Sequence, residues 1–217
     1  MEPSPDHSGP LKDDLLRAIA ARGGVRRYPA QTVLVHEDDR SDSLYIIVEG
    51  RVKIYGSSPN GREIVYNTHG PGEYFGEMTL DGGPRSASVM TLEPCECIVV
   101  PGAEVREFLA THPDFAMHLI IKLIGLVRRS THNVKRLALE DVYSRVARLL
   151  NELAVPMEGG SPGDRIVAER LTQQDIADRV GSSREMVSRI FTQLTQGGYV
   201  TLDKRQIVLR KKLPAGW

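Results

Sequence analysis

A short segment near the C-terminal end, SREMVSR at residues 183–189, carries charged side chains at helical spacing. On a helix, Arg184, Glu185 and Arg189 face outward, because the apolar residues between them form a separate stripe. An arginine can bond to guanine through both arms of its guanidinium, and a glutamate can accept from cytosine N4. The segment is therefore suited to contact base edges. Two simpler interpretations stay open: Glu185 and Arg189 form a surface ion pair at i,i+4 spacing, or Glu185 serves only as a helix cap.

The surrounding sequence predicts the two helices that position these side chains. Thr172 and Asp175 form a capping-box pattern that starts a first helix, and Gly181 supplies the left-handed residue that ends it. Ser182, with Glu185 three residues later, can start the second helix. The apolar residues expected to be buried are Ile176, Ala177 and Val180 in the first helix, and Val187, Ile190, Phe191 and Leu194 in the second. This pattern is typical of a helix-turn-helix motif.

A predicted β-hairpin follows this motif. Two alternating apolar runs, residues 197–202 and 207–210, flank the polar turn Asp203-Lys204-Arg205-Gln206. A hairpin placed directly after a helix-turn-helix is the wing of a winged helix, here with basic residues at its tip and end. The C-terminal part of the chain is therefore predicted to bind DNA.

A second group of residues with binding chemistry lies between Gly70 and Ser88. There the glycine-rich run GPGEYFGEM leads through a short connection to PRSAS, just before a strand. Glycines allow backbone N–H groups to approach a phosphate, the Arg85 guanidinium supplies charge, and the Ser86 hydroxyl donates. Glu77 would repel a phosphate but can accept from a sugar hydroxyl, which favours a nucleotide. The alternative is that Glu77 pairs with Arg85 across an ordinary turn.

Short strand-like runs separated by turn residues surround this second motif. After a predicted helix near residues 11–21, such runs occupy residues 32–35, 43–48, 51–55 and 63–66. Strands of this length and spacing indicate an antiparallel barrel or jelly roll. The predicted fold class is therefore α+β, with a β-roll in the N-terminal half.

A helical pattern, interrupted by glycine only at Gly125, runs from Pro113, a residue favoured in a first turn, to Leu139. Positions at alternating steps of four and three form a coiled-coil seam with one polar break. They hold Ala116, Ile120, Leu123, Val127, Ser130, Val134 and Leu137. The polar break can fix the register of two paired helices; alternatively, the helix packs only on its own barrel. Asp141 can cap a further helix over residues 142–154, and residues 165–168 form a strand candidate.

FGEM followed by PRSAS is similar to the phosphate-binding cassette of cyclic-nucleotide-binding domains. With the C-terminal winged helix, the chain resembles the cyclic-AMP receptor protein (Crp/Fnr) family of bacterial transcription regulators, from about Leu11 to Leu213. The family implies a β-roll sensor, a dimerising helix and a winged helix on a two-fold symmetric operator. The connection from Glu77 to Arg85 is shorter than in the cyclic-AMP receptor, which leaves the identity of the ligand open. The N-terminal cysteine cluster of the family's iron–sulfur branch is absent.

The resemblance also implies roles for individual residues. The ligand would contact Gly76, Glu77 and Met78 through its ribose side, Arg85 and Ser86 through its cyclic phosphate, and the backbone of Ala87. The purine would touch Ser130 and Thr131 from both subunits. Base readers would be Arg184, Glu185 and Arg189, and phosphate contacts on DNA would come from Thr172, Gln174 and Ser183.

Composition and charge narrow the function classes. The 217 residues carry no net charge, but the distribution is uneven. From Asp141 onward there are 12 Lys and Arg against 9 Asp and Glu, a net of +3, and the first 140 residues hold 16 against 19, a net of −3. This asymmetry fits a DNA reader joined to an acidic module. No apolar run is long enough to cross a membrane, and the start MEPSPDHSGP is no signal peptide, so we expect a cytoplasmic protein.

The residues that could hold a metal or catalyse a reaction form no such pattern. Cys95 and Cys97 lie two apart, so on a strand they point the same way and do not easily form a bridge. The six histidines lack metal-ligand spacing. No nucleophile motif with a neighbouring base and no P-loop is present. We therefore expect reduced, structural cysteines, no metal, no prosthetic group and no catalytic residues.

These observations predict a dimeric transcription regulator controlled by cyclic AMP or a related cyclic nucleotide. Its parts would be a disordered tail (1–10), a sensor domain (11–112), a dimerisation helix (113–140) and a winged helix-turn-helix domain (141–217). Its partners would be double-stranded DNA with a palindromic operator and, as the family implies, RNA polymerase. One alternative is the same regulator with a cyclic dinucleotide or no nucleotide as its signal. Another is a cyclic-nucleotide-regulated enzyme or channel subunit, which has no use for a winged helix.

Overall fold

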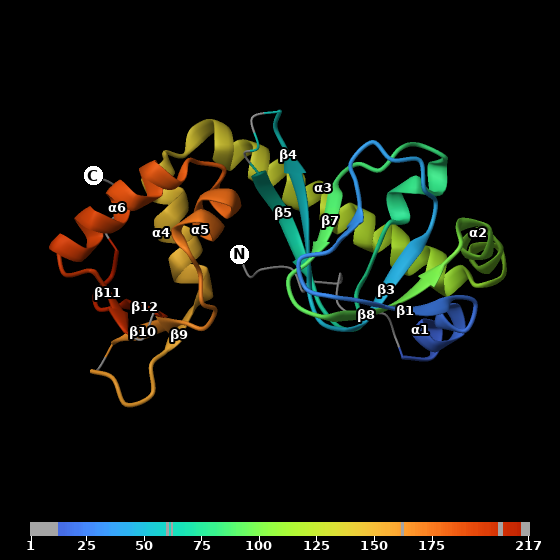
Figure 1. Ribbon diagram of the computed structural model, residues 1–217, viewed down its shortest axis with the longest axis horizontal. Helices are drawn as coiled ribbons and strands as arrows, with labels where there is room; N and C mark the ends of the chain where they lie inside the picture. Colours follow the sequence, from blue (N-terminus) through green and yellow to red (C-terminus); the bar gives the residue numbers. More distant parts are fainter. Residues whose placement is uncertain (1–12, 60, 62, 162, 204–205, 214–217) are drawn as a thin grey trace. The chain divides into compact units, whose positions relative to one another are not determined.

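The computed structural model describes residues 13–59, 61, 63–161, 163–203 and 206–213 (Figure 1). The chain divides into two compact units. One contains the residues up to Gly56 together with Val65–Thr131, and the other contains Ser57–Ile64 together with the residues from His132 onward. The predicted tail 1–10 and the basic residues Lys204 and Arg205 at the tip of the wing lie outside the described residues.

Two four-stranded sheets form the body of the first unit, with the strand orders β1-β8-β3-β6 and β2-β7-β4-β5. Strand β8 pairs antiparallel with β1 and β3, and β7 pairs antiparallel with β2 and β4. The strands are β1 (Gly24–Tyr28), β2 (Val33–Val35), β3 (Leu44–Glu49), β4 (Val52–Ser57), β5 (Glu63–His69), β6 (Tyr74–Phe75), β7 (Ser88–Thr91) and β8 (Cys95–Val100).

Alternation of apolar side chains along these strands produces one hydrophobic core of the first unit. Its buried members are Val35, Ile47, Val52, Phe75, Val89, Cys95 and Cys97. The rings of Tyr45 and Phe75 stack with their centroids 4.8 Å apart. Both cysteines are free thiols, and burial raises the pKa of Cys97 to about 12. These thiols therefore act as small apolar side chains.

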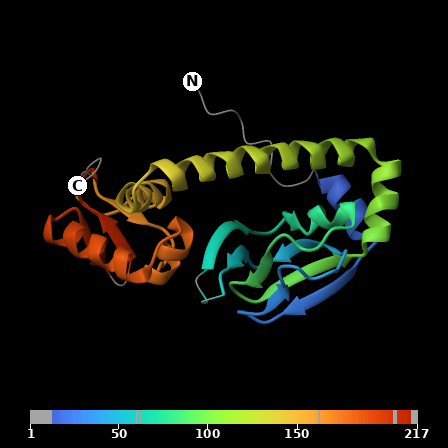
Figure 2. The ribbon, with the colours of Figure 1, turned by 90° about the horizontal axis from the view of Figure 1, so that it is seen from above.

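A second core lies beneath the helices of the first unit. Phe108, Phe115 and Leu119 pack there with Leu44, Ile46 and Tyr74 of the β1-β8-β3-β6 sheet. Figure 2 shows the long helix α3 as one continuous ribbon that begins directly after α2. The helical elements are α1 (Asp13–Ala20), the 3-10 helix η1 (Glu77–Asp81), α2 (Gly102–Thr111) and α3 (Pro113–Leu139). Helix α2 was not predicted from the sequence, whereas α3 spans the predicted range.

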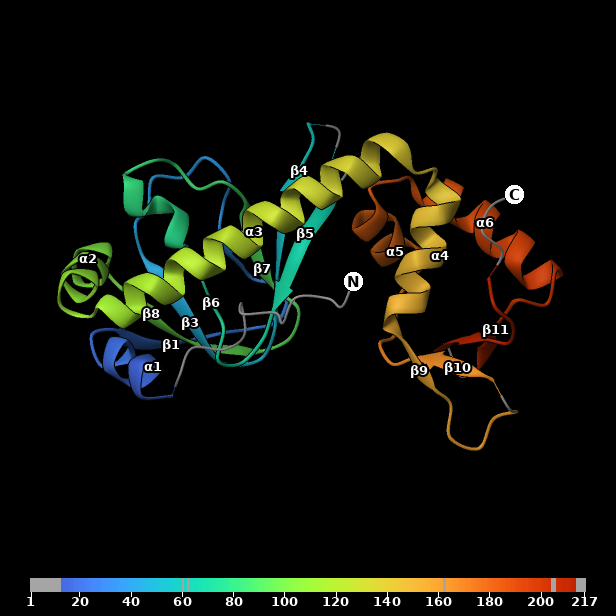
Figure 3. The same cartoon turned by 180° about the vertical axis from the view of Figure 1, so that it is seen from behind.

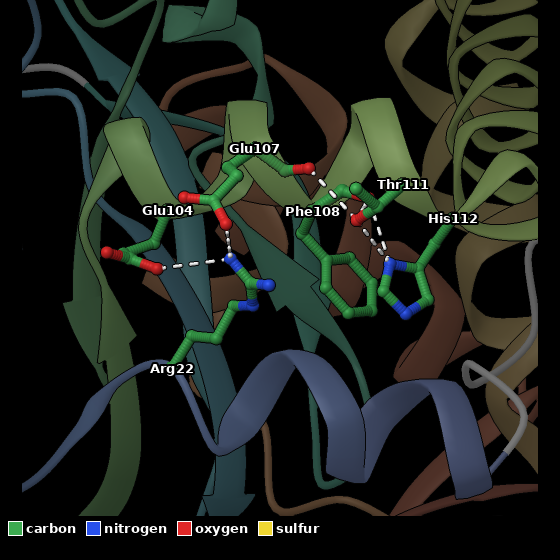
Figure 4. A network of polar contacts seen from close by, with 6 residues as sticks. All are labelled: Arg22, Glu104, Glu107, Phe108, Thr111 and His112. Carbon is green, nitrogen blue, oxygen red and sulfur yellow. Dashed lines mark hydrogen bonds and ion pairs between the residues drawn. The ribbon is translucent and has the colours of Figure 1, made fainter.

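Helix α2 is fixed to the turn that follows α1 by a polar network (Figure 4). The Arg22 guanidinium lies 3.2 Å from carboxylate oxygens of both Glu104 and Glu107 and 5.5 Å from the centre of the Phe108 ring. On the other side of that ring, His112 stacks at a centroid distance of 3.8 Å. The corner between α2 and α3 is thereby held by packing as well as by charge.

The second unit combines three helices with a small sheet of order β11-β12-β10-β9, whose elements are seen from behind in Figure 3. Its elements are α4 (Val142–Leu153), β9 (Ala154–Pro156), β10 (Arg165–Val167), α5 (Gln173–Val180), α6 (Arg184–Gln196), β11 (Val200–Asp203) and β12 (Gln206–Leu209). The predicted helix over residues 142–154 ends one residue earlier, because Ala154 already begins β9, a strand that was not predicted. The expected wing forms, with Val200 opposite Leu209 and Asp203 opposite Gln206.

The start of the second unit is organised by two side chains near its first helix. Asp141 caps α4 as predicted, since its Oδ1 accepts a hydrogen bond of 2.7 Å from the Ser144 N–H. Arg145 is 8% exposed and donates to the carbonyl oxygens of Val180 at 2.9 Å and Glu140 at 2.6 Å. Arg145 thus connects Glu140, two residues before α4, to the C-terminal end of α5.

The predicted fold class is confirmed. A β-roll, a long helix and a C-terminal winged helix follow one another along the chain. All seven residues predicted as the inner faces of the two helix-turn-helix segments are buried.

Candidate functional site

The connection between β6 and β7 in the first unit, residues 76–87, is built around Gly76 and Arg85. Gly76 has φ +95°, a left-handed conformation that favours glycine. A Cβ atom at this position would lie 2.6 Å from an Arg85 guanidinium nitrogen and 2.6 Å from the Ser43 carbonyl oxygen. Glycine is therefore required both by the backbone conformation and by the close approach of Arg85.

Arg85 is one of the most buried charged side chains in the first unit, with 3% of its surface exposed. Its guanidinium donates to Ser41 Oγ at 2.9 Å, to the Gly76 carbonyl at 3.1 Å and to the Ser43 carbonyl at 2.8 Å. Among the described residues it forms no ion pair with a carboxylate. Burial lowers the pKa of Arg85. A buried cation without an anionic partner is energetically costly, so this arrangement is suited to receive an anion.

Glu77 does not pair with Arg85, the simpler alternative that the sequence left open. Its Oε1 instead lies 3.4 Å from the ammonium nitrogen of Lys122 on α3. The sequence did not reveal Lys122 as part of this site. The available signal was its position, because it continues the buried face that Phe115 and Leu119 form at helical spacing.

The connection between β6 and β7, which we call the ligand connection, also carries three other predicted ligand residues, Met78, Ser86 and Ala87. Met78 is 48% exposed, and the exposed Ser86 hydroxyl donates to Met78 Sδ at 3.3 Å. Ala87 is half-buried, and Ser88 Oγ accepts from the Glu37 N–H at 3.0 Å. The structure therefore places Gly76, Arg85 and Ser86 around one short connection, with Glu77 and Met78 at the start of η1.

Ser130 and Thr131, the predicted purine contacts, are exposed on α3. The Thr131 hydroxyl donates to the Val127 carbonyl at 3.0 Å, a common bond for threonine within a helix. No described part of the ligand connection is bonded to either residue. Their role in ligand binding stays a prediction.

The seam predicted along α3 is wrong at Leu123. That residue packs against the core of the first unit, whereas its neighbour Ile124 is 46% exposed. The reason is that α3 has two apolar faces, one of which covers its own β-roll. The second face is an exposed apolar stripe, which we define as Met117, Ile120, Ile124, Val127 and Val134. Exposed apolar surface of this extent is a mark of an interaction site.

The helix-turn-helix of the second unit is held by short-range caps. The capping box forms as predicted: Thr172 Oγ1 accepts from the Asp175 N–H at 3.1 Å, and Asp175 Oδ2 accepts from the Thr172 N–H at 2.7 Å. Gly181 ends α5 with φ +65°. The start of α6 differs from the prediction, because Ser183 rather than Ser182 is the N-cap and accepts from the Met186 N–H at 3.2 Å.

Recognition residues lie on the outer surface of α6. Arg184, Glu185 and Arg189 are all exposed, and they are separated from the buried face of Val187, Ile190, Phe191 and Leu194. Gln174 is exposed on α5 and donates to Asp178 Oδ1 at 2.7 Å. Thr172 and Ser183, predicted to bind DNA phosphates, lie at the N-termini of the two helices. Helix N-termini favour anions such as phosphates.

Neither a metal-binding cluster nor a membrane-spanning helix is found among the described residues. No cluster of His, Cys, Asp or Glu in them could hold a metal ion. Within the same residues, no helix has the length and apolar character needed to span a membrane.

A buried arginine in a glycine-rich loop and a capped helix-turn-helix with a wing define a sensor joined to a DNA-binding module. The sequence profiles of two domain families agree with this description: the cyclic nucleotide-binding domain matches residues 25–112, and the Crp-like helix-turn-helix domain matches residues 144–213.

Similar proteins cover most of the chain. A CRP-like cAMP-activated global transcriptional regulator of Mycobacterium tuberculosis is 32% identical over 183 residues, which are 84% of this chain and 82% of that protein. The cAMP-activated global transcriptional regulator CRP of Pasteurella multocida is 29% identical, over 92% of this chain and 96% of its own. The chain thus belongs to the CRP-like (Crp/Fnr) family of transcription regulators.

A solved structure extends the likeness to the fold. The c-di-GMP-responsive global regulator CLP of Xanthomonas campestris has a TM-score of 0.79 and 28% identity, and the match covers 92% of this chain and 100% of the other. Relatives of this chain therefore respond to different cyclic nucleotides.

Proposed function

We propose that this protein is a homodimeric transcription regulator whose DNA binding is controlled by a cyclic nucleotide bound at Arg85. The observation that carries the proposal is the buried, unpaired charge of Arg85. The three acceptors around it fix the guanidinium but do not neutralise it. A cyclic phosphate would supply that neutralising charge through short, charge-assisted hydrogen bonds.

The remaining parts of the ligand site follow from this assignment. Ser86 and the backbone of Ala87 bind the same phosphate, Gly76, Glu77 and Met78 line the sugar side, and Ser130 and Thr131 contact the purine. Cyclic AMP is the favoured ligand, because the curated relatives are cAMP-activated. A cyclic dinucleotide is the second candidate, because a structural relative responds to c-di-GMP. Both share the phosphate chemistry that Arg85 requires.

DNA recognition is assigned to α6. Arg184, Glu185 and Arg189 read base edges, while Thr172, Gln174 and Ser183 bind phosphates. The target is a palindromic operator read by two copies of the chain, with RNA polymerase as a further partner in the cytoplasm. The exposed apolar stripe of α3 supports the dimer, because pairing two such stripes removes apolar surface from water.

Titration calorimetry with cyclic AMP, cyclic GMP and cyclic di-GMP tests the ligand assignment. We expect Arg85→Leu to abolish binding and Arg85→Lys to weaken it strongly, because lysine keeps the charge but loses the planar fork. Circular dichroism establishes that each variant is folded, which matters because Arg85 also bonds to two backbone carbonyls. A folded Arg85→Leu protein that binds as the parent does would refute the phosphate site.

Sedimentation of Val127→Asp tests the dimer. Val127 is 64% exposed in the apolar stripe, so a charge there should leave the fold intact while placing two carboxylates in the paired helices. We expect a monomer that has lost operator binding and keeps some nucleotide affinity. A variant that remains dimeric would show that the stripe is not the contact between subunits.

A further inference from the structure

Lys122 is a buried lysine on the face of α3 that covers the β-roll. Only 7% of its surface is exposed, and it lies at helical spacing from the buried residues Phe115 and Leu119. Lysine is almost never buried to this degree without a partner, because its ammonium group loses its hydration. The partners of Lys122 therefore indicate why a charge is kept at a position where the fold would accept an apolar residue.

Within the described residues, the Lys122 ammonium makes three short contacts, two with Tyr74 and one with Glu77, at the point where β6 leads into the ligand connection. It donates to the Tyr74 carbonyl at 2.5 Å, lies 3.5 Å from the centre of the Tyr74 ring, and lies 3.4 Å from Glu77 Oε1. Tyr74 and Glu77 stand on either side of Phe75 and Gly76. Lys122 thus fixes both ends of the short segment that contains the left-handed Gly76.

Lys122 is the cation that neutralises Glu77. The side chains of both residues are only 9% exposed, so neither charge is well screened by water. The other nearby carboxylate, Glu73, is already engaged by His69 at 2.8 Å and by the Gly70 N–H at 2.8 Å. Burial lowers the pKa of Lys122, and the adjacent Glu77 opposes this shift.

The pairing leaves the Glu77 carboxylate able to accept a further bond. A carboxylate has acceptor positions on both oxygens, and the ammonium group occupies only some of those on Oε1. Glu77 directly follows Gly76, whose carbonyl accepts from Arg85. Arg85, which can bind a phosphate, is therefore bonded to the residue directly before Glu77. The Glu77 carboxylate can in turn accept from a neighbouring hydroxyl.

We infer that Lys122 is a positioning residue that holds the Glu77 carboxylate in place and oriented toward the ligand, and thereby sets a preference for ligands with a free sugar 2′-hydroxyl. The inference rests on the proposed function, since it needs a nucleotide at Arg85. Lys122 acts through Glu77 and does not itself contact the ligand.

The experiment compares each ligand with its 2′-deoxy counterpart. Calorimetry on the full-length protein gives the ratio of affinities for cyclic AMP and 2′-deoxy cyclic AMP, and likewise for cyclic di-GMP and its 2′-deoxy analogue. A hydrogen bond to a charged group corresponds to about tenfold or more in affinity. We expect a ratio of this size in the parent protein and a clearly smaller ratio in Lys122→Met and in Glu77→Gln, because a misplaced or neutral acceptor forms a weaker hydrogen bond.

Double substitution distinguishes positioning from a general effect on the fold. If Lys122 acts through Glu77, Lys122→Met should change the ratio no further in a Glu77→Gln background. The double variant buries no charge at this pair. We therefore expect it to fold even if Lys122→Met alone does not. Lys135→Met, the same change at an exposed position of α3, is the matched control and should retain the parental ratio.

Two results would overturn the inference. One is a parental ratio in folded Lys122→Met, whether or not both affinities fall together. The other is additive effects in the double variant. Failure of the proposed function has a different signature, since the parent protein would then bind none of the four nucleotides.

Discussion

Arg85 in the β-roll and Arg184 on α6 are the same side chain in opposite settings. Arg85 is 3% exposed and is fixed by three hydrogen bonds to its own unit, whereas Arg184 is exposed on the first turn of a helix. The side-chain entropy of Arg85 is therefore lost when the chain folds, while that of Arg184 is lost only when a partner binds.

This difference matches the sizes of the two proposed partners. A cyclic nucleotide offers few contacts, so each protein group must already be in place when it arrives. A DNA operator offers many phosphates and bases, so binding can order several flexible side chains and still be favourable. The β-roll thus uses arginine as part of its architecture, and the recognition helix uses it as a surface group.

The largest expected difference between Arg85 and Arg184 is in their contribution to folding stability. Arg85→Ala should lower the free energy of unfolding by about 2–4 kcal/mol, because the Ser41 hydroxyl and the carbonyls of Ser43 and Gly76 lose the hydrogen bonds that Arg85 donates. Arg184→Ala should change it by no more than about 0.5 kcal/mol, as is usual for surface positions. Urea denaturation of both variants without ligand measures this difference. Equal effects would mean that the hydrogen bonds of Arg85 contribute nothing to the fold.

A smaller effect is expected for DNA binding by Arg184→Ala. Loss of a bidentate contact to guanine should cost about 1–3 kcal/mol on the selected operator and relax discrimination at one base pair. Binding titrations across single-base operator variants measure both quantities. Arg40→Ala, which removes the same charge from an exposed position in the first unit, controls for net charge. An unchanged base preference in Arg184→Ala would contradict base reading by this residue.

The smallest effect concerns the start of the recognition helix. Ser183→Ala removes the N-cap of α6 and should cost about 1 kcal/mol of stability. Ser182→Ala should be nearly neutral, because the observed cap is Ser183. Thermal or urea unfolding of the two alanine variants separates these positions. If Ser182→Ala lowered the stability more than Ser183→Ala, the N-cap of α6 would be Ser182, as the sequence pattern predicted.

Local signals explain which features could be predicted from the sequence. The capping box of Thr172 and Asp175, the glycine at 181 and the cap at Asp141 depend on residues a few positions apart, and all form as expected. Helix α2 escaped prediction because Pro101 precedes it without a side-chain cap. Strand β9 escaped because it has only 3 residues and directly follows α4.

Features that depend on distant residues were harder to predict. The pairing of Glu77 with Lys122 joins η1 to α3, and no sequence spacing encodes it. The inward packing of Leu123 depends on which of two apolar faces of α3 meets the β-roll, a choice made by the fold as a whole. Motif residues could therefore be identified, but their partners could not.

Gly76 limits how this protein can diverge. Any other residue at that position adds a side chain that strains the backbone and meets both Arg85 and the Ser43 carbonyl. Every substitution of Gly76 is therefore expected to be unfavourable. Descendants of this protein that come to bind a new signal molecule are expected to keep this glycine. Met78 is open to such change, because its side chain is 48% exposed and is bonded only to the exposed Ser86 hydroxyl among the described residues. New specificity would thus evolve around a fixed phosphate anchor, through substitutions on the rim of the loop.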